Sequence, residues 1–205
     1  MYINRDIAPK APIMRFIKGK GGLATYAEII KAGFDKRDLR TLLKSRQIDK
    51  IDRGLYKLQS GSNLSHPDLV AVSIKIPNGV VCLISALYFH EATKEIPSQV
   101  AMAIPRGAHA GKINYPPTQI YRFTSNAWES GIEEHKIGQR SIKVYNLAKT
   151  IADCFKFRNK IGMDIVRDAI KTAITEKGVK PNDIMFYAKI CRVDTVIKPI
   201  LEAMI

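Results

Sequence analysis

The order of apolar and polar positions is most informative between Thr25 and Leu58. Thr25 and Glu28 have the spacing of a capping box, in which two side chains satisfy backbone N–H groups at a helix start. Gly33 suits a helix end, where positive φ is common. Asp35 then offers an N-cap for another helix. The pattern predicts two short helices joined by a tight turn.

The second of these helices has two distinct faces. Leu39, Leu42 and Leu43 recur at i, i+3 and i+4 and form an apolar stripe that is expected to pack on a core. A second stripe is polar and mostly basic, and it is free to contact an anionic partner. It consists of Arg37, Arg40, Thr41 and Lys44, with Lys36 next to it.

Beyond Gln47, β-favouring residues flank a turn at Asp52-Arg53-Gly54, which predicts a hairpin from Ile48 to Leu58. Helix, turn, basic helix and hairpin are typical of a winged helix-turn-helix, whose second helix enters the DNA major groove. A solvated helix face is the alternative interpretation of the basic stripe. Further cations on the hairpin favour DNA contact, and these wing residues are Lys50, Arg53 and Lys57.

The flanking sequence sets the domain boundaries. After an N-terminal arm, Ile13, Phe16 and Ile17 form a helical stripe that predicts a first helix from Pro12 to Lys18. A polar, turn-forming stretch at residues 61–66 marks a linker. We therefore expect a DNA-binding domain at residues 1–60 and a second domain at residues 67–205.

The second domain is predicted to be α+β, with a small, mostly antiparallel sheet packed against helices. Helical spacing covers Leu69 to Ile76, and the apolar segment Val80 to His90 suits a buried helix. Strand-like runs follow at Gln99–Ile104, Gln119–Phe123, Ile132–Ile137 and Ser141–Tyr145. Later helices are expected from the N-cap Asn146, over Met163–Glu176, over Pro181–Cys191, and from Asp194 to the end with a kink at Pro199.

The charge distribution strengthens the interpretation of the first domain. The 205-residue chain has a formal net charge of +14. Residues 1–60 contain 14 lysines and arginines against 6 acidic residues, so more than half of the excess lies in under a third of the chain. A basic domain of this kind supplies the salt-dependent part of nucleic-acid affinity.

Other residue classes argue against metals, disulfides and membranes. Cys82, Cys154 and Cys191 are far apart in apolar surroundings and are expected to be buried thiols. The four histidines show no metal-ligand spacing, so neither a metal nor a cofactor is expected. No apolar run reaches the ~20 residues needed to span a bilayer. We expect a soluble, cytoplasmic protein.

Two motifs that resemble phosphate or metal chemistry lack necessary parts. Gly107–Lys112 has three residues between its glycines and Ile113 after the lysine, so it is not a Walker loop. Glu134 and Lys136 have the spacing of some metal-dependent nucleases, but the preceding strand offers no second acid. An enzyme acting on nucleic acid stays an alternative, supported only by this pair.

A hydrolase set of Ser85, His90 and Asp153 lacks the GxSxG motif around the serine. No catalytic residue is therefore assigned, and the chain is not expected to be an enzyme. The loop from Pro105 to Lys112 is either a mobile recognition loop or a solvated connector. Further cations are candidates for a second basic patch, and these are Arg122, Arg140, Lys143, Lys149, Lys156, Arg158 and Lys160.

Nearly the whole chain resembles the AbiEi antitoxins of bacterial type IV toxin-antitoxin systems. None of the matching features is a catalytic signature. They are Leu23-Ala24-Thr25, Gly33-Phe34, the leucine-rich second helix, Asp52-Arg53-Gly54-Leu55-Tyr56, Asn78-Gly79-Val80, Ser85-Ala86-Leu87, Val100 to Pro105 and Tyr145 to Asp153.

The resemblance implies an autorepressor and antitoxin. The winged helix would bind inverted repeats in double-stranded promoter DNA, and the second domain would neutralise a cognate nucleotidyltransferase-like toxin. This family is generally described without a stable toxin complex, so no direct interface is implied. By this resemblance, DNA contact falls on the basic stripe and the wing, and antitoxicity on Arg106, Lys149 and Arg158. A winged helix that binds protein is a further alternative.

Overall fold

A computed structural model describes residues 10–204, so most of the predicted N-terminal arm lies outside the described residues. The N-terminal unit, residues 10–60, combines three helices with three short strands. In order, these are α1 (Lys10–Gly19), β1 (Leu23–Thr25), α2 (Tyr26–Lys31), α3 (Lys36–Lys44), β2 (Ile48–Asp52) and β3 (Leu55–Leu58).

The local signals of the sequence act as predicted in this unit. The Thr25 backbone N–H donates to Glu28 Oε2 at 2.9 Å, and the Glu28 backbone N–H donates to Thr25 Oγ1 at 3.2 Å. Asp35 Oδ1 accepts a hydrogen bond from the Arg37 backbone N–H at 2.9 Å. Gly33 has a φ of 86° just beyond α2. The capping box, the N-cap and the helix stop are therefore confirmed.

The three strands form an antiparallel sheet in the order β1-β3-β2. Strand β1 was not predicted, because three residues after a glycine-rich turn are too short to show alternation. One face of this sheet, with Ala24, Tyr56 and Leu58, packs on the core formed with α1–α3. The opposite face, with Leu23 and Leu55, joins a core that extends into the rest of the chain.

The C-terminal unit, residues 67–204, contains a five-stranded sheet and eight helices among its described residues. The strands are β4 (Val80–Val81), β5 (Val100–Pro105), β6 (Thr118–Phe123), β7 (Ile132–Ile137) and β8 (Arg140–Tyr145). The helices are α4 (Pro67–Lys75), α5 (Leu83–Phe89), α6 (Ser125–Glu129), α7 (Leu147–Lys156), α8 (Arg158–Ile161), α9 (Met163–Thr175), α10 (Pro181–Cys191) and α11 (Asp194–Glu202).

The larger sheet is mixed, in the order β6-β5-β4-β8-β7. Strands β5 and β6 are parallel, as are β4 and β8, so the prediction of a mostly antiparallel sheet is wrong. The prediction of one helix over Val80 to His90 is also wrong at its start. Val80 and Val81 form the central strand, and α5 begins at Leu83. A continuous apolar run does not distinguish a buried strand from a buried helix.

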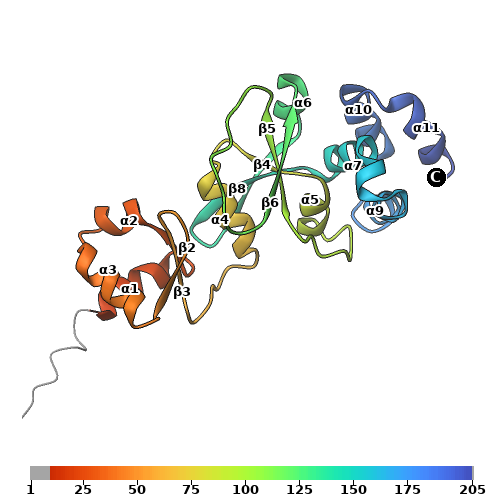
Figure 1. Cartoon of the computed structure of the whole chain (residues 1–205). Coiled ribbons are helices and arrows are strands. Elements are labelled where there is room, and N and C mark those ends of the chain that lie inside the picture. The colour runs from red at the N-terminus through yellow and green to blue at the C-terminus, as the bar shows by residue number, and fades with distance from the viewer. Residues whose placement is uncertain (1–9, 205) are drawn as a thin grey trace, which may run out of the picture.

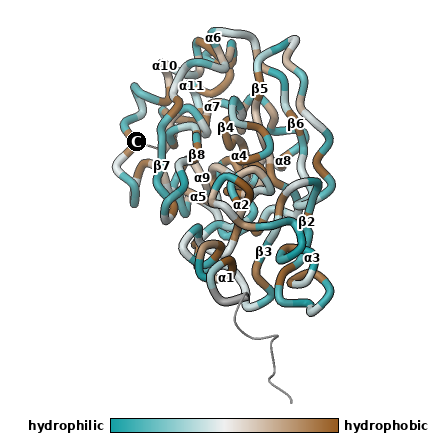
Figure 2. Tube along the Cα trace, turned by 90° about the vertical axis from the view of Figure 1, so that its left-hand side faces the viewer, coloured by the Kyte–Doolittle hydropathy of each residue, from teal (hydrophilic) through white to brown (hydrophobic). Residues whose placement is uncertain are grey.

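Both faces of the larger sheet are covered. Val81, Met102 and Val144 face α4 and the small sheet of the N-terminal unit. Val80 and Ala103 face the core formed with α5, α7 and the C-terminal helices. Figure 1 shows this layering, with the N-terminal unit on the α4 side and α7, α9, α10 and α11 on the other. Figure 2 shows hydrophobic residues along β4 and β5. In residues 10–204 no helix is long and apolar enough to cross a membrane.

Candidate nucleic-acid interface

Helix α3 presents the predicted basic stripe to solvent. Leu39 and Leu42 are buried on its inner face, while Leu43 is half-buried. The side chains of the stripe are exposed; they are Lys36, Arg37, Arg40, Thr41 and Lys44. Within residues 10–204, none of its four cations forms an ion pair. Their charge is therefore available to an external anion.

The hairpin formed by β2 and β3 divides the predicted wing cations between two faces. Lys50 is paired with Tyr56, whose side chain lies on the α1–α3 side of the sheet. Lys57 is paired with Leu23, whose side chain lies on the opposite side. Because side chains alternate along a strand, Lys50 lies on the helix side and Lys57 does not. The predicted wing cations therefore divide, with Lys50 on the α3 side of the small sheet and half-buried Lys57 on its opposite side.

The tip of the hairpin contacts the C-terminal unit through Asp52. This carboxylate accepts hydrogen bonds from Asn114 Nδ2 at 3.1 Å and from the Arg53 backbone N–H at 2.6 Å. Lys75 of α4 lies 3.5 Å from it and also donates to the Arg53 carbonyl at 2.9 Å. Burial alone raises the pKa of Asp52, but these hydrogen bonds and Lys75 outweigh burial and lower it. The Arg53 side chain itself is exposed.

A second contact between the units uses the capping-box carboxylate. Arg140, at the start of β8, donates to Glu28 Oε1 at 2.7 Å and Oε2 at 3.0 Å, and to the Leu23 carbonyl at 3.0 Å. Burial raises the pKa of Glu28, but the hydrogen bonds from Arg140 and Thr25 lower it overall. Arg140 therefore does not belong to a free basic patch.

The predicted linker is packed between the units. Ser62 Oγ donates to the Gly21 carbonyl at 2.6 Å, and Leu64 is buried in the core shared by both units. A side chain on Gly22 would collide with the Gly61 carbonyl, 2.7 Å from the position of its Cβ. These contacts hold the small sheet against the larger unit and leave α3 on the outer side (Figure 1).

The loop between β5 and β6 contributes to the same junction. Ala108, Ala110 and Ile113 pack partly on the shared core, and Asn114 reaches Asp52. The loop from Pro105 to Lys112 was predicted to be either a mobile recognition loop or a solvated connector. Neither prediction included its observed role, which is to cover the shared core. Sequence alternation gives no signal for such a role, since the contacts of the loop are with distant parts of the chain.

The three residues associated with antitoxicity lie in different environments. Arg106 is exposed at the end of β5, and half-buried Arg158 donates to the Phe155 carbonyl at 3.1 Å. Lys149 has no exposed surface. The inclusion of Lys149 in a surface patch is therefore wrong, because helical spacing alone did not reveal that α7 is buried on nearly all sides.

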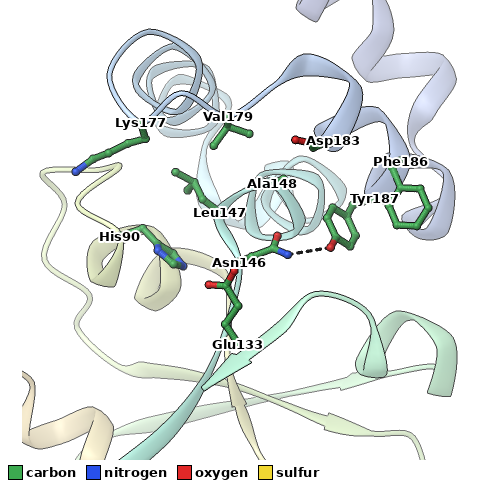
Figure 3. A pocket seen from close by; sticks show the side chains of 10 residues that line it. All are labelled: His90, Glu133, Asn146, Leu147, Ala148, Lys177, Val179, Asp183, Phe186 and Tyr187. Carbon is green, nitrogen blue, oxygen red and sulfur yellow. Dashed lines mark hydrogen bonds between the residues drawn. The ribbon is translucent and has the colours of Figure 1, made fainter. Parts of the chain in front are cut away.

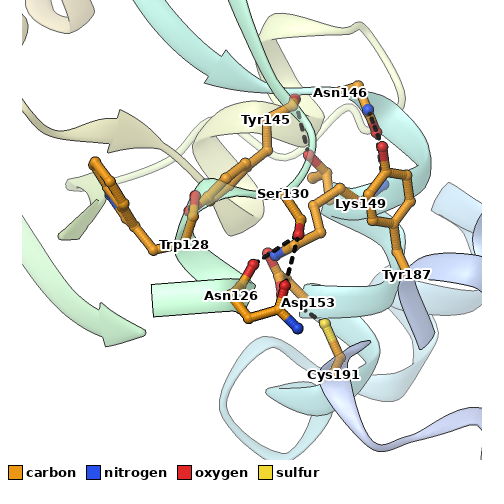
Figure 4. Close-up of polar contacts among 10 residues, drawn as sticks. Asn126, Trp128, Ser130, Tyr145, Asn146, Lys149, Asp153, Tyr187 and Cys191 are labelled. Atoms are coloured by element: carbon orange, nitrogen blue, oxygen red, sulfur yellow. Dashed lines mark hydrogen bonds and ion pairs between the residues drawn. The ribbon is translucent and has the colours of Figure 1, made fainter. Parts of the chain in front are cut away.

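Lys149 instead belongs to a buried polar network. Its Nζ lies 2.5 Å from Asp153 Oδ2 and 4.3 Å from the ring centroid of Tyr145, and Cys191 Sγ donates to Asp153 Oδ1 at 3.1 Å. Figure 4 shows this network between α7 and α10. Burial raises the pKa of Asp153, against the opposing effect of Lys149. Lys149 and Asp153 therefore act as each other's ion-pair partners inside the core.

A separate cavity of about 440 Å³ is lined by both polar and apolar side chains (Figure 3). His90 Nε2 is 2.8 Å from the Tyr145 carbonyl, and Tyr187 accepts a hydrogen bond from Asn146 at 2.8 Å. Ser85 Oγ accepts from the Ala101 backbone N–H at 2.9 Å. Ser85, His90 and Asp153 thus have separate partners, and the structure does not assemble them as a hydrolase set.

Comparisons with known proteins identify the fold only. No family model matches the chain, and no curated protein matches it by sequence. Among solved structures, it is similar to the crystal structure of the RV2827C protein from Mycobacterium tuberculosis, with a TM-score of 0.55 and 10% sequence identity. The match covers 96% of this chain and 80% of that one. The similarity therefore extends over nearly the whole chain and concerns the fold alone.

Proposed function

We propose that the chain is a DNA-binding transcriptional repressor whose N-terminal unit is a winged helix-turn-helix. The observation that carries the proposal is the exposed basic face of α3, whose four cations have no acidic partner within residues 10–204. The helix follows a tight turn after α2 and precedes a hairpin, the order of elements in winged helices. Its outward position supports access to a DNA groove.

The resemblance to AbiEi antitoxins extends this proposal to an autorepressor and antitoxin. In that case the target is the promoter DNA of the protein itself, and the C-terminal unit opposes a nucleotidyltransferase-like toxin. The distribution of charge supports separate roles, because the α3 cations lie on one unit and exposed Arg106 lies on the other. The proposed DNA contacts are Lys36, Arg37, Arg40, Thr41, Lys44, Lys50 and Arg53, without Lys57.

The DNA-binding proposal is tested with a duplex from the region upstream of the reading frame. Arg37→Ala/Arg40→Ala should weaken DNA binding at least tenfold, because two side chains that contact phosphates or base edges are removed. The buried inner face of α3 is unchanged, so the fold should be retained. Arg167→Ala/Lys171→Ala is the matched control, because it removes the same charge from two exposed side chains of α9. Equal affinity of the two variants in an anisotropy titration would remove α3 from the interface.

The antitoxin proposal needs a separate assay. Full-length Arg37→Ala/Arg40→Ala, expressed from an unrelated promoter, should still restore growth to cells that express the cognate nucleotidyltransferase. The same variant should fail to repress a reporter that carries the upstream DNA. Loss of growth rescue by the folded variant would contradict the assignment of antitoxicity to the C-terminal unit.

A further inference from the structure

Two adjoining hollows lie where β5, β6, α6, α7 and α10 meet. The outer hollow, about 600 Å³, is lined by Arg106, Thr124, Asn126, Lys156, Lys189, Ile190 and Arg192. The inner hollow, about 180 Å³, shares Arg106, Thr124 and Lys156 with it and adds Arg122, Phe123, Ala127, Asp153 and Phe157. We treat them as one basic cavity.

The charge of the basic cavity is strongly unbalanced. Five cations line it, and they are Arg106, Arg122, Lys156, Lys189 and Arg192. Asp153 is the one carboxylate in this lining, and it is already bonded to Lys149 and Cys191. None of the five cations forms an ion pair with another described residue.

The cations come from separate elements with fixed backbones. The Arg106 backbone N–H donates to the Phe123 carbonyl at 2.7 Å, which fixes the end of β5 beside β6. Lys156 ends α7, while Lys189 and Arg192 lie at the end of α10. Helix C-termini favour cations, which helps the folded chain to tolerate this charge. All five cations are exposed side chains around a concave surface, and grouping charges of one sign there raises the positive potential in the hollow.

Neutral donors complete the site. The Thr124 side chain makes no capping hydrogen bond to α6, although it occupies the N-cap position. Asn126 also lines the cavity; Ser130 Oγ donates to its backbone carbonyl at 2.6 Å, and within residues 10–204 its side-chain amide donates no hydrogen bond. Hydroxyl, amide, lysine and arginine donors together are the groups that bind phosphoryl oxygens.

We propose that the basic cavity binds a ligand with two or more clustered phosphoryl groups. Its source is either a free nucleoside polyphosphate or the 5′-phosphorylated end of a nucleic acid, which present the same charged group. The inner hollow also has an apolar wall, formed by buried Phe123 and half-buried Phe157, whose rings stack on each other.

The site is independent of the proposed DNA-binding surface. Figures 1 and 2 both place α6 and α10 well away from α3. Solvation alone would also account for exposed lysines and arginines. It does not explain why five cations from separate elements line one hollow with no free carboxylate among them. A negative result for phosphate binding in the basic cavity would therefore not contradict DNA binding by α3, and the reverse also holds.

The test is calorimetric titration of the full chain at constant ionic strength. The probes are tripolyphosphate, ATP, GTP and a short RNA with either a 5′-triphosphate or a 5′-hydroxyl. Arg106→Gln/Lys189→Gln should weaken phosphate binding at least tenfold. Arg167→Ala/Lys171→Ala removes the same charge outside the cavity and should bind as the parent does.

Tighter binding of ATP or GTP than of tripolyphosphate would support the proposal and identify a nucleotide site. Preference for the 5′-triphosphorylated RNA over the 5′-hydroxyl RNA and free nucleotides would support it and identify a nucleic-acid end. Circular dichroism establishes that the cavity variant is folded. No saturable binding of any phosphorylated probe, or an equal loss in the α9 variant, would overturn the proposal.

Discussion

At the scale of single residues, Glu28 has two structural roles. Its carboxylate completes the capping box of α2 and also receives the Arg140 guanidinium. Both partners are largely shielded, with side chains 15% and 27% exposed for Arg140 and Glu28. One side chain thus couples the start of a local helix to the position of a whole unit.

We expect Glu28→Ala to destabilise the protein by on the order of 2 kcal/mol, since it removes a helix cap and a shielded ion pair. Glu28→Gln retains a capping-box side chain but loses the charge, so its loss should be about half as large. Urea unfolding at neutral pH measures both changes. Equal destabilisation by the two substitutions would show that Arg140 accounts for the whole effect.

The Lys149–Asp153 pair is a second residue-scale feature, buried entirely within the core. Removing one member leaves a buried charge without a partner, so Lys149→Met should cost about 3–5 kcal/mol. Replacing both, as Lys149→Met/Asp153→Leu, should cost much less, because no unpaired charge is left. A double-mutant cycle from denaturant unfolding measures the coupling, and additive losses would contradict it.

At the scale of elements, helices with explicit caps could be predicted closely. Thr25, Asp35 and Asn146 mark the starts of α2, α3 and α7, and each side chain accepts the expected backbone hydrogen bond. Short elements without such signals were missed. Strand β1 has three residues and α6 has five, and both depend on contacts with distant strands and helices.

Strand alternation gives a finer prediction for the hairpin, provided that α3 binds DNA. Lys50 lies on the α3 side, so Lys50→Ala should flatten the dependence of log K on log salt by about 0.9. Lys57→Ala removes the same charge from the opposite face and should leave the slope unchanged. Salt titrations of both variants on the same duplex provide the measurement; equal changes would contradict the division of faces.

At the scale of the whole molecule, the sequence indicated two units but not how they meet. The predicted linker at residues 61–66 was consistent with independent domains, whereas the structure buries Leu64 between them. Arg140 and Glu28 are 112 positions apart, and Asn114 and Asp52 are 62 apart. Neither pair has a local pattern, because each exists only once the sheets are in place. Of the cations in the basic cavity, Arg122 and Lys156 belonged to the predicted second patch, whereas Lys189 and Arg192 were not predicted, because α10 meets the patch only in the folded chain.

The junction between the units also sets how the molecule responds to acid. Glu28 and Asp52 both have lowered pKa values in the folded protein. The unfolded chain therefore takes up protons first as pH falls, and the stabilisation from both groups is present above their ordinary pKa values. That stabilisation is lost as pH falls through the folded values, so the junction should weaken below about pH 4.

Asp52→Asn tests this acid response of the junction. The asparagine side chain has nearly the same shape as aspartate but carries no carboxylate that could be protonated. The variant should be less stable than the parent at pH 7, by on the order of 2 kcal/mol, since Lys75 and two backbone N–H groups lose a charged acceptor. The difference should shrink as pH falls below the ordinary aspartate pKa, because the unfolded parent chain then binds a proton that the folded Asp52 carboxylate, with its lowered pKa, resists. Urea unfolding at several pH values measures it. A difference that stays constant from pH 7 to pH 3 would mean that the charge of Asp52 does not hold the hairpin tip against the C-terminal unit.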